Sequence, residues 1–296
     1  MANLKKDRGA VDAAQSNQQA RSTWERKAVG GHRATASSGS RAYFDQIRAY
    51  RYGYETPFIP RFFDFEGLSG KRVLEIGVGN GIDAVEMLKN GAEYSGIDIT
   101  LSHLALTKTY TDFVALEVPG NVEAILEGDL LETSVSGNYD VIYSFGVLHH
   151  IAHESLFLKK ISSLLSNQGE LRIGVYSKYS FFNLWLVVTW LVKNRLKNSL
   201  VDWKSHLAEG SDLNEPVVIK IRSKKAVLEL LKDSGYEVVR YEKKGFVQGY
   251  IPIIGRFLGP DGPVLNGLGS LLGWYHCFVC KKNEAQKLPL GVRKSP

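Results

Sequence analysis

A glycine-rich turn after a short apolar run is the part of the chain best suited to holding a ligand. Residues 73–81 read VLEIGVGNG, which places glycines at positions 77, 79 and 81. The pattern predicts a buried strand that turns sharply into a helix at Ile82–Lys89, because glycine accepts positive φ angles and lets a ligand approach the backbone. The helix N-terminus adds unpaired N–H groups and a partial positive charge. Glu75 is acidic at a position where a purely structural strand is usually apolar.

A second strand that ends in an acid indicates a nucleoside ligand. Residues 94–100 read YSGIDIT, and Asp98 follows Gly77 by 21 residues, about the separation at which a β-α-β unit brings a carboxylate to a ribose. The alternative interpretation is a solvated aspartate in a turn. The glycine pattern departs from the dinucleotide fingerprint G-x-G-x-x-G, whose third glycine would fall at Ile82. This departure disfavours a nicotinamide oxidoreductase.

Two further segments complete a family pattern. Residues 127–131 read EGDLL, and residues 139–150 read YDVIYSFGVLHH. With the two earlier segments, in this order and spacing across about Lys71 to Tyr176, they make the chain resemble the class I S-adenosylmethionine-dependent methyltransferases, of the small-molecule bacterial type. The resemblance is specific for the class of cofactor and says almost nothing about the substrate.

The resemblance implies roles for individual residues toward the cofactor S-adenosyl-L-methionine. The glycine turn would hold the methionine end, Asp98 would bind the ribose, and Asp129 would accept a hydrogen bond from the adenine amino group. Leu130 would lie near the base, and Phe145 would flank the cofactor. The expected cofactor-binding residues are Tyr43, Arg51, Glu75, Gly77, Gly79, Gly81, Asp98, Ile99, Asp129, Leu130 and Phe145.

The segment before the glycine turn is dense in aromatic residues. Residues 43–52 read YFDQIRAYRY and predict a helix that packs its Tyr and Phe side chains onto the sheet. The segment also resembles the lid of small-molecule bacterial methyltransferases, in which Tyr and Arg close over the methionine moiety. An aromatic face attracts a sulfonium as it does an ammonium, and Arg pairs well with a carboxylate. Tyr43 and Arg51 are therefore candidates for the lid.

Three residues are candidates for catalysis. Methyl transfer is an in-line displacement, so the protein mainly aligns the acceptor and excludes water, and a base helps when the acceptor carries a proton. His149 and His150 follow the fourth predicted strand, where the acceptor should meet the methyl group, and one of them is the candidate base. Tyr176, at the end of the fifth strand, is the next candidate. In the alternative interpretation, the two histidines merely begin a helix and pack or cap there.

No metal site is expected. Cys277 and Cys280 form a lone C-x-x-C, whereas a zinc site needs a second pair of ligands. On a strand, these positions point to opposite faces, which disfavours both a disulfide and shared ligation. So few cysteines suit a reducing cytoplasm.

The alternation of strand and helix predicts an α/β fold. We expect a Rossmann-like, seven-stranded, mostly parallel sheet with an antiparallel last strand, helices on both faces, an N-terminal lid and a helical cap insertion. The predicted strands are Arg72–Ile76, Glu93–Ile97, Val122–Leu126, Tyr139–Ser144, Glu170–Tyr176, Tyr236–Glu242 and Trp274–Lys281. The predicted helices include Arg41–Arg51, Pro57–Phe65, His153–Leu165 with a stop at Gly169, and Ser223–Asp233 with Ser223 as its N-cap.

The domain organisation follows from these elements. Residues 1–40, rich in Ala, Ser, Gln and Gly, predict a flexible arm, and residues 41–68 form the lid helices. Residues 69–176 form the cofactor-binding core, and residues 223–282 the rest of the sheet, with a second insertion at 245–273. Residues 283–296 form a basic tail. Residues 177–222 form an apolar cap that contains Trp185 and Trp190, of which at most one is expected to face a pocket.

The two insertions leave two interpretations open. In one, they only pack on each other as a cap. In the other, they line a pocket for an apolar or lipid-like acceptor, and contact with a membrane surface is a variant of this second interpretation. The longest apolar stretch, Phe181–Val192, is too short to span a bilayer. Residues 1–33 lack the apolar core of a signal peptide, so we expect a cytoplasmic protein without a transmembrane segment.

The net charge of +6 does not indicate nucleic acid. Residues 1–33 and 281–296 each carry a net charge of +4, which leaves −2 for residues 34–280. The basic character therefore belongs to the tails, and we expect a small-molecule partner and no nucleic acid.

Several functions fit this sequence. The favoured one is methyl transfer to a small molecule, with oxygen, nitrogen and carbon acceptors all open. A second keeps the cofactor but cyclises its methionine arm and releases methylthioadenosine. A third is a cofactor-binding protein without catalysis.

Overall fold

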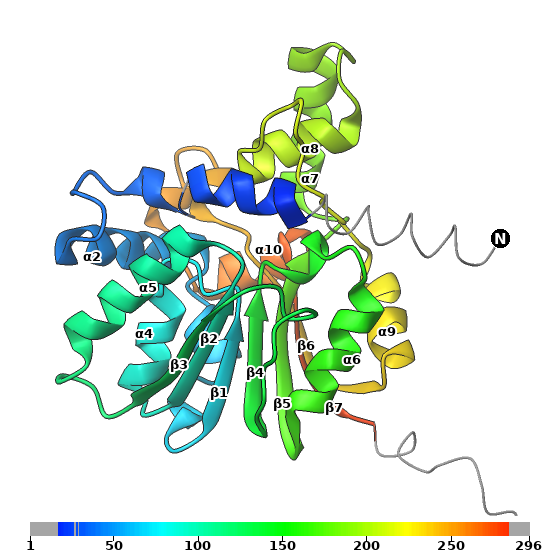
Figure 1. Cartoon of the computed structure of the whole chain (residues 1–296). Helices are drawn as coiled ribbons and strands as arrows, with labels where there is room; N and C mark the ends of the chain where they lie inside the picture. Colours follow the sequence, from blue (N-terminus) through cyan, green and yellow to red (C-terminus); the bar gives the residue numbers. More distant parts are fainter. Residues whose placement is uncertain (1–16, 27, 29, 284–296) are drawn as a thin grey trace, which may run out of the picture.

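A seven-stranded sheet forms the centre of the protein. The computed structural model describes residues 17–26, 28 and 30–283 (Figure 1). The strand order is β3-β2-β1-β4-β5-β7-β6. β7 pairs antiparallel with both β5 and β6, and the other neighbouring strands pair in parallel. The strands are β1 (Arg72–Ile76), β2 (Glu93–Asp98), β3 (Asn121–Glu127), β4 (Tyr139–Phe145), β5 (Leu165–Tyr176), β6 (Tyr236–Lys244) and β7 (Tyr275–Lys282). The predicted fold class, with its antiparallel last strand, is confirmed.

Helices cover both faces of the sheet. α4 (Ile82–Lys89) and α5 (Leu101–Val114) lie on one side, and α6 (Glu154–Leu164) and α9 (Lys224–Asp233) on the other (Figure 1). Successive side chains of a strand point to opposite faces, so a strand covered on both sides is apolar throughout. Val73 packs with the α4 side and Leu74 with the α6 side. The same alternation places the two free cysteines, Cys277 and Cys280, in different core clusters.

Two helix ends test the predicted boundaries. Ser223 is the N-cap of α9, where its hydroxyl accepts from the Ala226 N–H, as predicted. The predicted stop of α6 at Gly169 is wrong, because α6 ends at Leu164 and β5 already begins at Leu165, which pairs with Tyr139. A Cβ at Gly169 would lie 2.7 Å from the Tyr139 carbonyl oxygen. The glycine therefore permits close approach of two strands and is not a helix terminator.

The N-terminal segments lead from the carboxyl ends of the strands to the start of β1 (Figure 1). α2 (Arg41–Tyr50) begins at Ser40, whose hydroxyl accepts from the Tyr43 N–H, and it continues as a π-helical turn, η2 (Arg51–Glu55). The predicted helix at 57–65 is shorter, as α3 (Ile59–Phe62). Short 3₁₀ turns are η1 (Gly31–Arg33) and η3 (Glu66–Leu68). Residues 17–26, which the composition assigned to a flexible arm, are helical.

The cap insertion leaves the sheet after β5 and returns to the same place. It contains α7 (Phe181–Thr189), the π-helical turn η5 (Trp190–Asn194) and α8 (Leu200–Glu209). A bridge between Ser177 and Arg222 joins its two ends. Figure 1 shows α7 and α8 projecting beyond the carboxyl ends of the strands. Over the part of the chain that the structure describes, no helix combines the length and the apolar character needed to cross a membrane.

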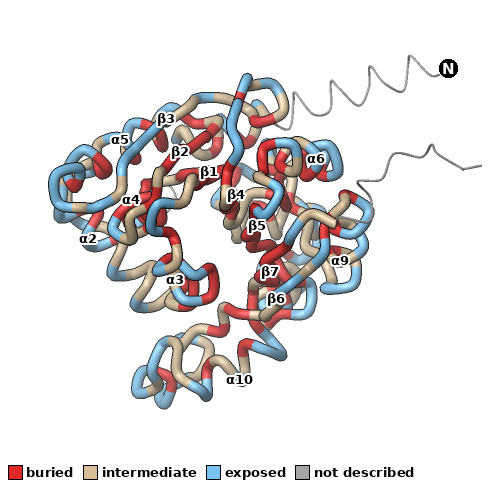
Figure 2. Tube along the Cα trace, turned by 90° about the horizontal axis from the view of Figure 1, so that it is seen from below, coloured by how far each residue is buried: buried red, intermediate tan, exposed pale blue. Residues whose placement is uncertain are grey.

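The second insertion lies between β6 and β7. It contains two 3₁₀ turns, η6 (Gln248–Tyr250) and η7 (Gly255–Phe257), followed by α10 (Pro263–Leu272). α10 contacts the end of β6 through Lys243 and Lys244, and Figure 2 shows that much of its surface is exposed. Phe181 of α7 contacts Phe246 and Tyr250, so the two insertions meet at the start of α7.

Candidate active site

A cavity of about 230 Å³ lies at the carboxyl ends of the strands. Ligands of open α/β sheets bind at this edge, where the loops after β1, β2 and β4 converge. The glycine turn forms one wall. The φ angles of Gly77, Gly79 and Gly81 are 82°, 53° and 73°, all in the left-handed region that favours glycine.

The three glycines of this turn serve different purposes. A Cβ at Gly77 would lie 2.3 Å from Val147, and one at Gly81 would lie 2.9 Å from the Cα of Thr107, so both positions are fixed by packing. A Cβ at Gly79 would meet nothing within 4 Å. Gly79 lines the cavity, and the open space over it leaves room for a ligand to approach the backbone. Gly81 does not line the cavity; it begins α4 instead.

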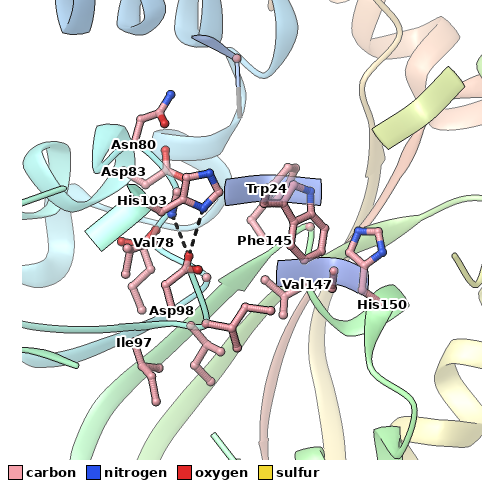
Figure 3. A pocket seen from close by; sticks show the side chains of 18 of the residues that line it. Trp24, Val78, Asn80, Asp83, Ile97, Asp98, His103, Phe145, Val147 and His150 are labelled. Carbon is pink, nitrogen blue, oxygen red and sulfur yellow. Dashed lines mark hydrogen bonds and ion pairs between the residues drawn. The ribbon is translucent and has the colours of Figure 1, made fainter. Parts of the chain in front are cut away.

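Two carboxylates, at the ends of neighbouring strands, line the cavity. Asp98 accepts from the Thr100 N–H at 2.9 Å and from the Gly79 N–H at 3.2 Å, and His103 Nδ1 lies 3.6 Å from it (Figure 3). Asp129 accepts from the Leu131 N–H at 2.8 Å. Each carboxylate oxygen has two acceptor sites, so the backbone bonds fix the orientation of these groups and leave capacity for hydroxyl or amino donors of a ligand.

Arg51 is held by a buried acidic partner. Its guanidinium pairs with both oxygens of Asp83, and Asp83 also accepts from the hydroxyls of Tyr52 at 2.6 Å and Tyr143 at 2.8 Å. Burial alone would raise the pKa of Asp83, but the Arg51 charge and these donors hold that pKa below its ordinary value. Arg51 still lines the cavity, although the carboxylate bound to it belongs to the protein and not to a ligand.

Glu75 lies at the floor of the cavity as a buried acid. Its Oε2 accepts from the Tyr94 hydroxyl at 2.6 Å. Burial, with the nearby negative charge of Asp83, raises the pKa of Glu75 well above its ordinary value. A group that is easily protonated at this position is able to offer either a donor or an acceptor to a ligand.

The helix at residues 17–26 closes the cavity from above. Asn17, Ala20 and Trp24 line the cavity, and the Asn17 amide donates to the carboxylate of Asp129. Glu25 accepts from the backbone N–H groups of Leu101 and Ser102, at the start of α5. An acid at a helix N-terminus satisfies unpaired N–H groups and is favoured by the helix dipole. These contacts explain why this polar segment is helical here.

Trp24 enters the cavity between the Asp98 side and His150 (Figure 3). Its ring meets that of His150 edge-on, with the centroids 5.0 Å apart. Tyr43, the expected aromatic lid residue, does not line the cavity. It is buried beside Phe44 and Ile47 in α2, because that face of the helix packs on the protein.

The far end of the cavity holds a cluster of polar side chains. His150 Nδ1 lies 2.7 Å from the Val218 carbonyl oxygen, and Nε2 lies 3.5 Å from Oε2 of Glu209. The Tyr176 hydroxyl also hydrogen-bonds to Glu209, and burial together with the negative charge of Glu209 raises the pKa of Tyr176 well above its ordinary value. Tyr176 therefore stays protonated and acts as a donor, not as a base.

His149 lies behind this cluster and does not line the cavity. Its ring stacks on Tyr176 with the centroids 3.7 Å apart, and neither of its nitrogens has a hydrogen-bond partner among the residues that the structure describes. Burial, with the neighbouring His150, lowers the pKa of His149 well below its ordinary value, so the ring is neutral. Among the described residues, His149, His150 and Glu209 also form the group able to hold a metal ion, with ligand atoms within 4.8 Å of one another.

Most of the expected residues come together at this site. The expected residues that line the cavity are Arg51, Glu75, Gly77, Gly79, Asp98, Ile99, Asp129, Leu130, Phe145, His150 and Tyr176. Tyr43, Gly81 and His149 lie outside its lining. The sequence analysis missed Asn17, Trp24, Glu55 and Glu209. Their segments carry no glycine turn or strand end, so no local pattern marks them.

Comparison with known proteins agrees with this geometry. A family model described as a methyltransferase domain matches residues 45–241. The ubiquinone biosynthesis O-methyltransferase of Bradyrhizobium diazoefficiens is 25% identical over 171 residues, which are 56% of this chain and 66% of that protein. The enzyme of the same name from Nitrosococcus oceani is 30% identical over 103 residues, 35% of this chain and 42% of that protein. The chain thus spans from two fifths to two thirds of these relatives.

Solved structures share the fold. The magnesium protoporphyrin IX methyltransferase of Synechocystis, with bound SAH, matches with a TM-score of 0.55 at 14% identity, over 92% of this chain and 99% of that chain. The fold is therefore one that a methyltransferase with bound SAH also has. The chain belongs to the methyltransferase domain family.

The described residues fit this cofactor. The open space over Gly79 admits a ligand to the backbone, and the Asp98 and Asp129 carboxylates face the same cavity from successive strand ends. The proposed partner of the adenine amino group, Asp129, here accepts from the Asn17 amide, which is the same type of donor.

Proposed function

We propose that the protein transfers a methyl group to an oxygen of a small, apolar acceptor, with His150 as the base. The observation that carries the proposal is the His150–Glu209 contact at the far end of the cavity, at 3.5 Å. The relatives named O-methyltransferases support an oxygen acceptor. Trp24, Val147 and Ile151 line the cavity near His150 and favour an apolar substrate.

The tautomer of His150 suits a base. A carbonyl oxygen only accepts hydrogen bonds, so the contact with Val218 places a hydrogen on Nδ1 and leaves the lone pair on Nε2. Nε2 is then able to take the proton of an acceptor hydroxyl. The Glu209 carboxylate stabilises the positive charge that forms on the ring, and the protonated Tyr176 hydroxyl holds Glu209 in place.

The rest of the site positions the reactants. When bound, S-adenosylmethionine supplies a methyl group on a sulfonium that is already activated for in-line displacement. Asp98 and Asp129 would orient the nucleoside, and Gly79 would let the cofactor lie against the turn. The helix at residues 17–26 and the cap exclude water and hold the acceptor in line with the methyl group.

The compartment is part of this proposal. We infer a cytoplasmic enzyme, because a chain with only two cysteines, Cys277 and Cys280, suits a reducing compartment. Burial raises the pKa of both thiols well above the ordinary value, so neither is prepared for redox chemistry.

Product analysis tests the proposal. The protein is incubated with S-adenosylmethionine and a panel of apolar phenols, amines and carbon acids, and both products are identified by mass spectrometry. We expect S-adenosylhomocysteine together with a methyl ether. Methylthioadenosine would instead indicate cyclisation of the methionine arm, and a methylated amine or carbon would contradict the oxygen acceptor.

A matched pair of variants assigns the activity to this site. Asp98→Ala should weaken cofactor binding by about 1.5–3 kcal/mol, the range for a lost hydrogen bond to a charged group. Asp112→Ala, an exposed aspartate of α5, is the control and should bind normally. Equal affinity of both variants by calorimetry would remove Asp98 from the cofactor site.

A further inference from the structure

One face of α7 is apolar and exposed. The helix and the following turn η5 expose large apolar side chains at helical spacing, with exposed fractions between 42% and 68%. These residues are Leu184, Trp185, Val188, Leu191 and Val192. Positions i, i+1, i+4, i+7 and i+8 form one stripe on a helix. The opposite side buries two polar residues, Asn183 and Thr189, together with Leu186.

Basic residues border this stripe. Lys178 precedes the helix, and Lys193, Arg195 and Lys197 follow it, all exposed. No acidic residue occurs between positions 177 and 201. None of the four basic residues has an acidic partner within the part of the chain that the structure describes. The segment thus combines an apolar stripe with a net charge of +4.

We propose that α7 and η5 dock the protein on a membrane surface with anionic headgroups. A helix with an exposed apolar face and basic neighbours lies in the plane of the interface, with its apolar side chains among the acyl chains and its cations at the phosphates. Trp185 suits the headgroup region, where amphipathic rings gather. A second copy of the chain fits this face less well, because a two-fold interface would bring one +4 segment against another.

The second insertion lies next to the start of α7. Lys243 donates to the carbonyl oxygens of Tyr179, just before α7, and Leu271 in α10. The loop before α10 exposes three large apolar side chains by 62% to 80%, namely Ile253, Ile254 and Phe257. Figure 1 shows α7 beyond the carboxyl ends of the strands, the edge at which the cavity lies. Docking through α7 would therefore hold the cavity close to the membrane.

Vesicle binding tests the apolar stripe. The full chain is mixed with vesicles of phosphatidylcholine and phosphatidylglycerol, or of phosphatidylcholine alone, and the bound fraction is measured by flotation. We expect binding to the mixed vesicles. The double variant Val188→Asp/Leu191→Asp should lose most of it. The control Leu116→Asp/Leu156→Asp changes two exposed leucines elsewhere and should bind as the natural chain does.

A charge-reversal pair tests the basic border. Lys193→Glu/Arg195→Glu/Lys197→Glu should weaken partitioning by roughly a hundredfold or more, from the attraction of each basic residue to an anionic surface. Lys108→Glu/Lys159→Glu/Lys232→Glu makes the same change of net charge elsewhere and is the control. Both variants keep the basic tails, so any binding through the tails is the same in both. Equal loss in both would assign binding to net charge and overturn the proposal.

Two more outcomes would also overturn it. One is an absence of binding to the mixed vesicles. The other is a dimer in solution that Val188→Asp/Leu191→Asp converts to a monomer without a change in vesicle binding, which would make the stripe an interface between copies. These measurements need neither cofactor nor acceptor, so they are independent of the proposed reaction.

Discussion

Glu209 and His150 meet at the cavity although they come from different parts of the chain. Glu209 is the last residue of α8 in the cap, whereas His150 follows β4, and Glu209 Oε2 lies 3.5 Å from His150 Nε2. The cap reaches the histidine a second time, through the Val218 carbonyl at Nδ1. Both ring nitrogens are therefore positioned by the cap, which makes this insertion part of the proposed catalytic geometry and not only a cover.

Removing the proposed base should lower turnover without affecting the cofactor. We expect His150→Ala to reduce kcat by about 10²–10⁴, the usual contribution of a general base. Glu209→Gln should cost less, because the carboxylate acts through the ring. Adding Glu209→Gln to His150→Ala should change little further, since residues that act as a unit are not additive. Steady-state kinetics and calorimetry with S-adenosylhomocysteine measure both effects.

A chelator provides the control for the base hypothesis. His149, His150 and Glu209 lie close enough to hold a metal ion, so turnover is also measured after treatment with EDTA. We expect no change, because the protonation of Nε2 accounts for the chemistry. Loss of turnover that a divalent cation restores would make the cluster a metal site and contradict the role of His150 as the base.

The open space over Gly79 predicts a selective loss of cofactor binding. Gly79→Val should abolish most of the binding, because the branched side chain would occupy the space where the ligand meets the backbone. The backbone strain of this change needs a separate control. Gly70→Val provides it: Gly70 also has a positive φ, 67°, and open space within 4 Å, but it lies away from the cavity. Both variants should lose similar stability in urea, and only Gly79→Val should lose binding. Normal binding by Gly79→Val would exclude contact between cofactor and turn.

The helix at residues 17–26 lines the cavity, so we expect it to slow the release of the cofactor. Trp24→Ala should weaken binding by about 1–3 kcal/mol, typical of lost apolar contact in a pocket, mainly through faster dissociation. Gln18→Ala, an exposed position of the same helix, should behave as the natural chain. Stopped-flow fluorescence measures the dissociation rate. Amide exchange of residues 17–26 that is equal with and without S-adenosylhomocysteine would show that this helix is no lid.

The side of the cavity proposed to hold the cofactor could be predicted, because each of its parts is marked by a local sequence pattern. The turn at 77–81 needs glycine for its φ angles, and Asp98 and Asp129 follow strands whose apolar runs identify them. Strand order then brings these ends to one edge. The position of Ser223 as an N-cap is local in the same sense, since its partner Ala226 is three residues away.

The end of the cavity proposed for the acceptor could not be predicted, because it forms only when segments far apart in the sequence come together in the fold. Glu209 reaches His150 only because the cap returns through the Ser177–Arg222 bridge. Trp185 and Trp190 were candidates for the pocket, but neither lines it: Trp185 stacks on Phe182, and Trp190 donates to the Asn198 carbonyl. Tyr43 was misplaced for a similar reason, since tertiary packing chose which face of α2 is buried.

The buried, neutral His149 predicts a loss of stability in acid. Its pKa in the folded protein lies well below the ordinary value, because of burial and the neighbouring His150. In the unfolded chain the ring takes up a proton near pH 6.5, so below that pH the unfolded state binds more protons and is favoured. The stability due to the neutral ring is complete above about pH 6.5 and falls as the pH is lowered toward the folded pKa.

His149→Phe isolates this effect, because phenylalanine keeps the stacking on Tyr176 and does not titrate. Between about pH 7.5 and about pH 5.5, the natural chain should lose about 1.4 kcal/mol more of its free energy of unfolding than the variant. Burial also lowers the pKa of His276, to about 4, but that residue is present in both chains and its contribution cancels. Urea unfolding at the two pH values measures the difference. If both chains lose the same stability, the folded protein accommodates a charged His149, and the ring is not held neutral by its surroundings.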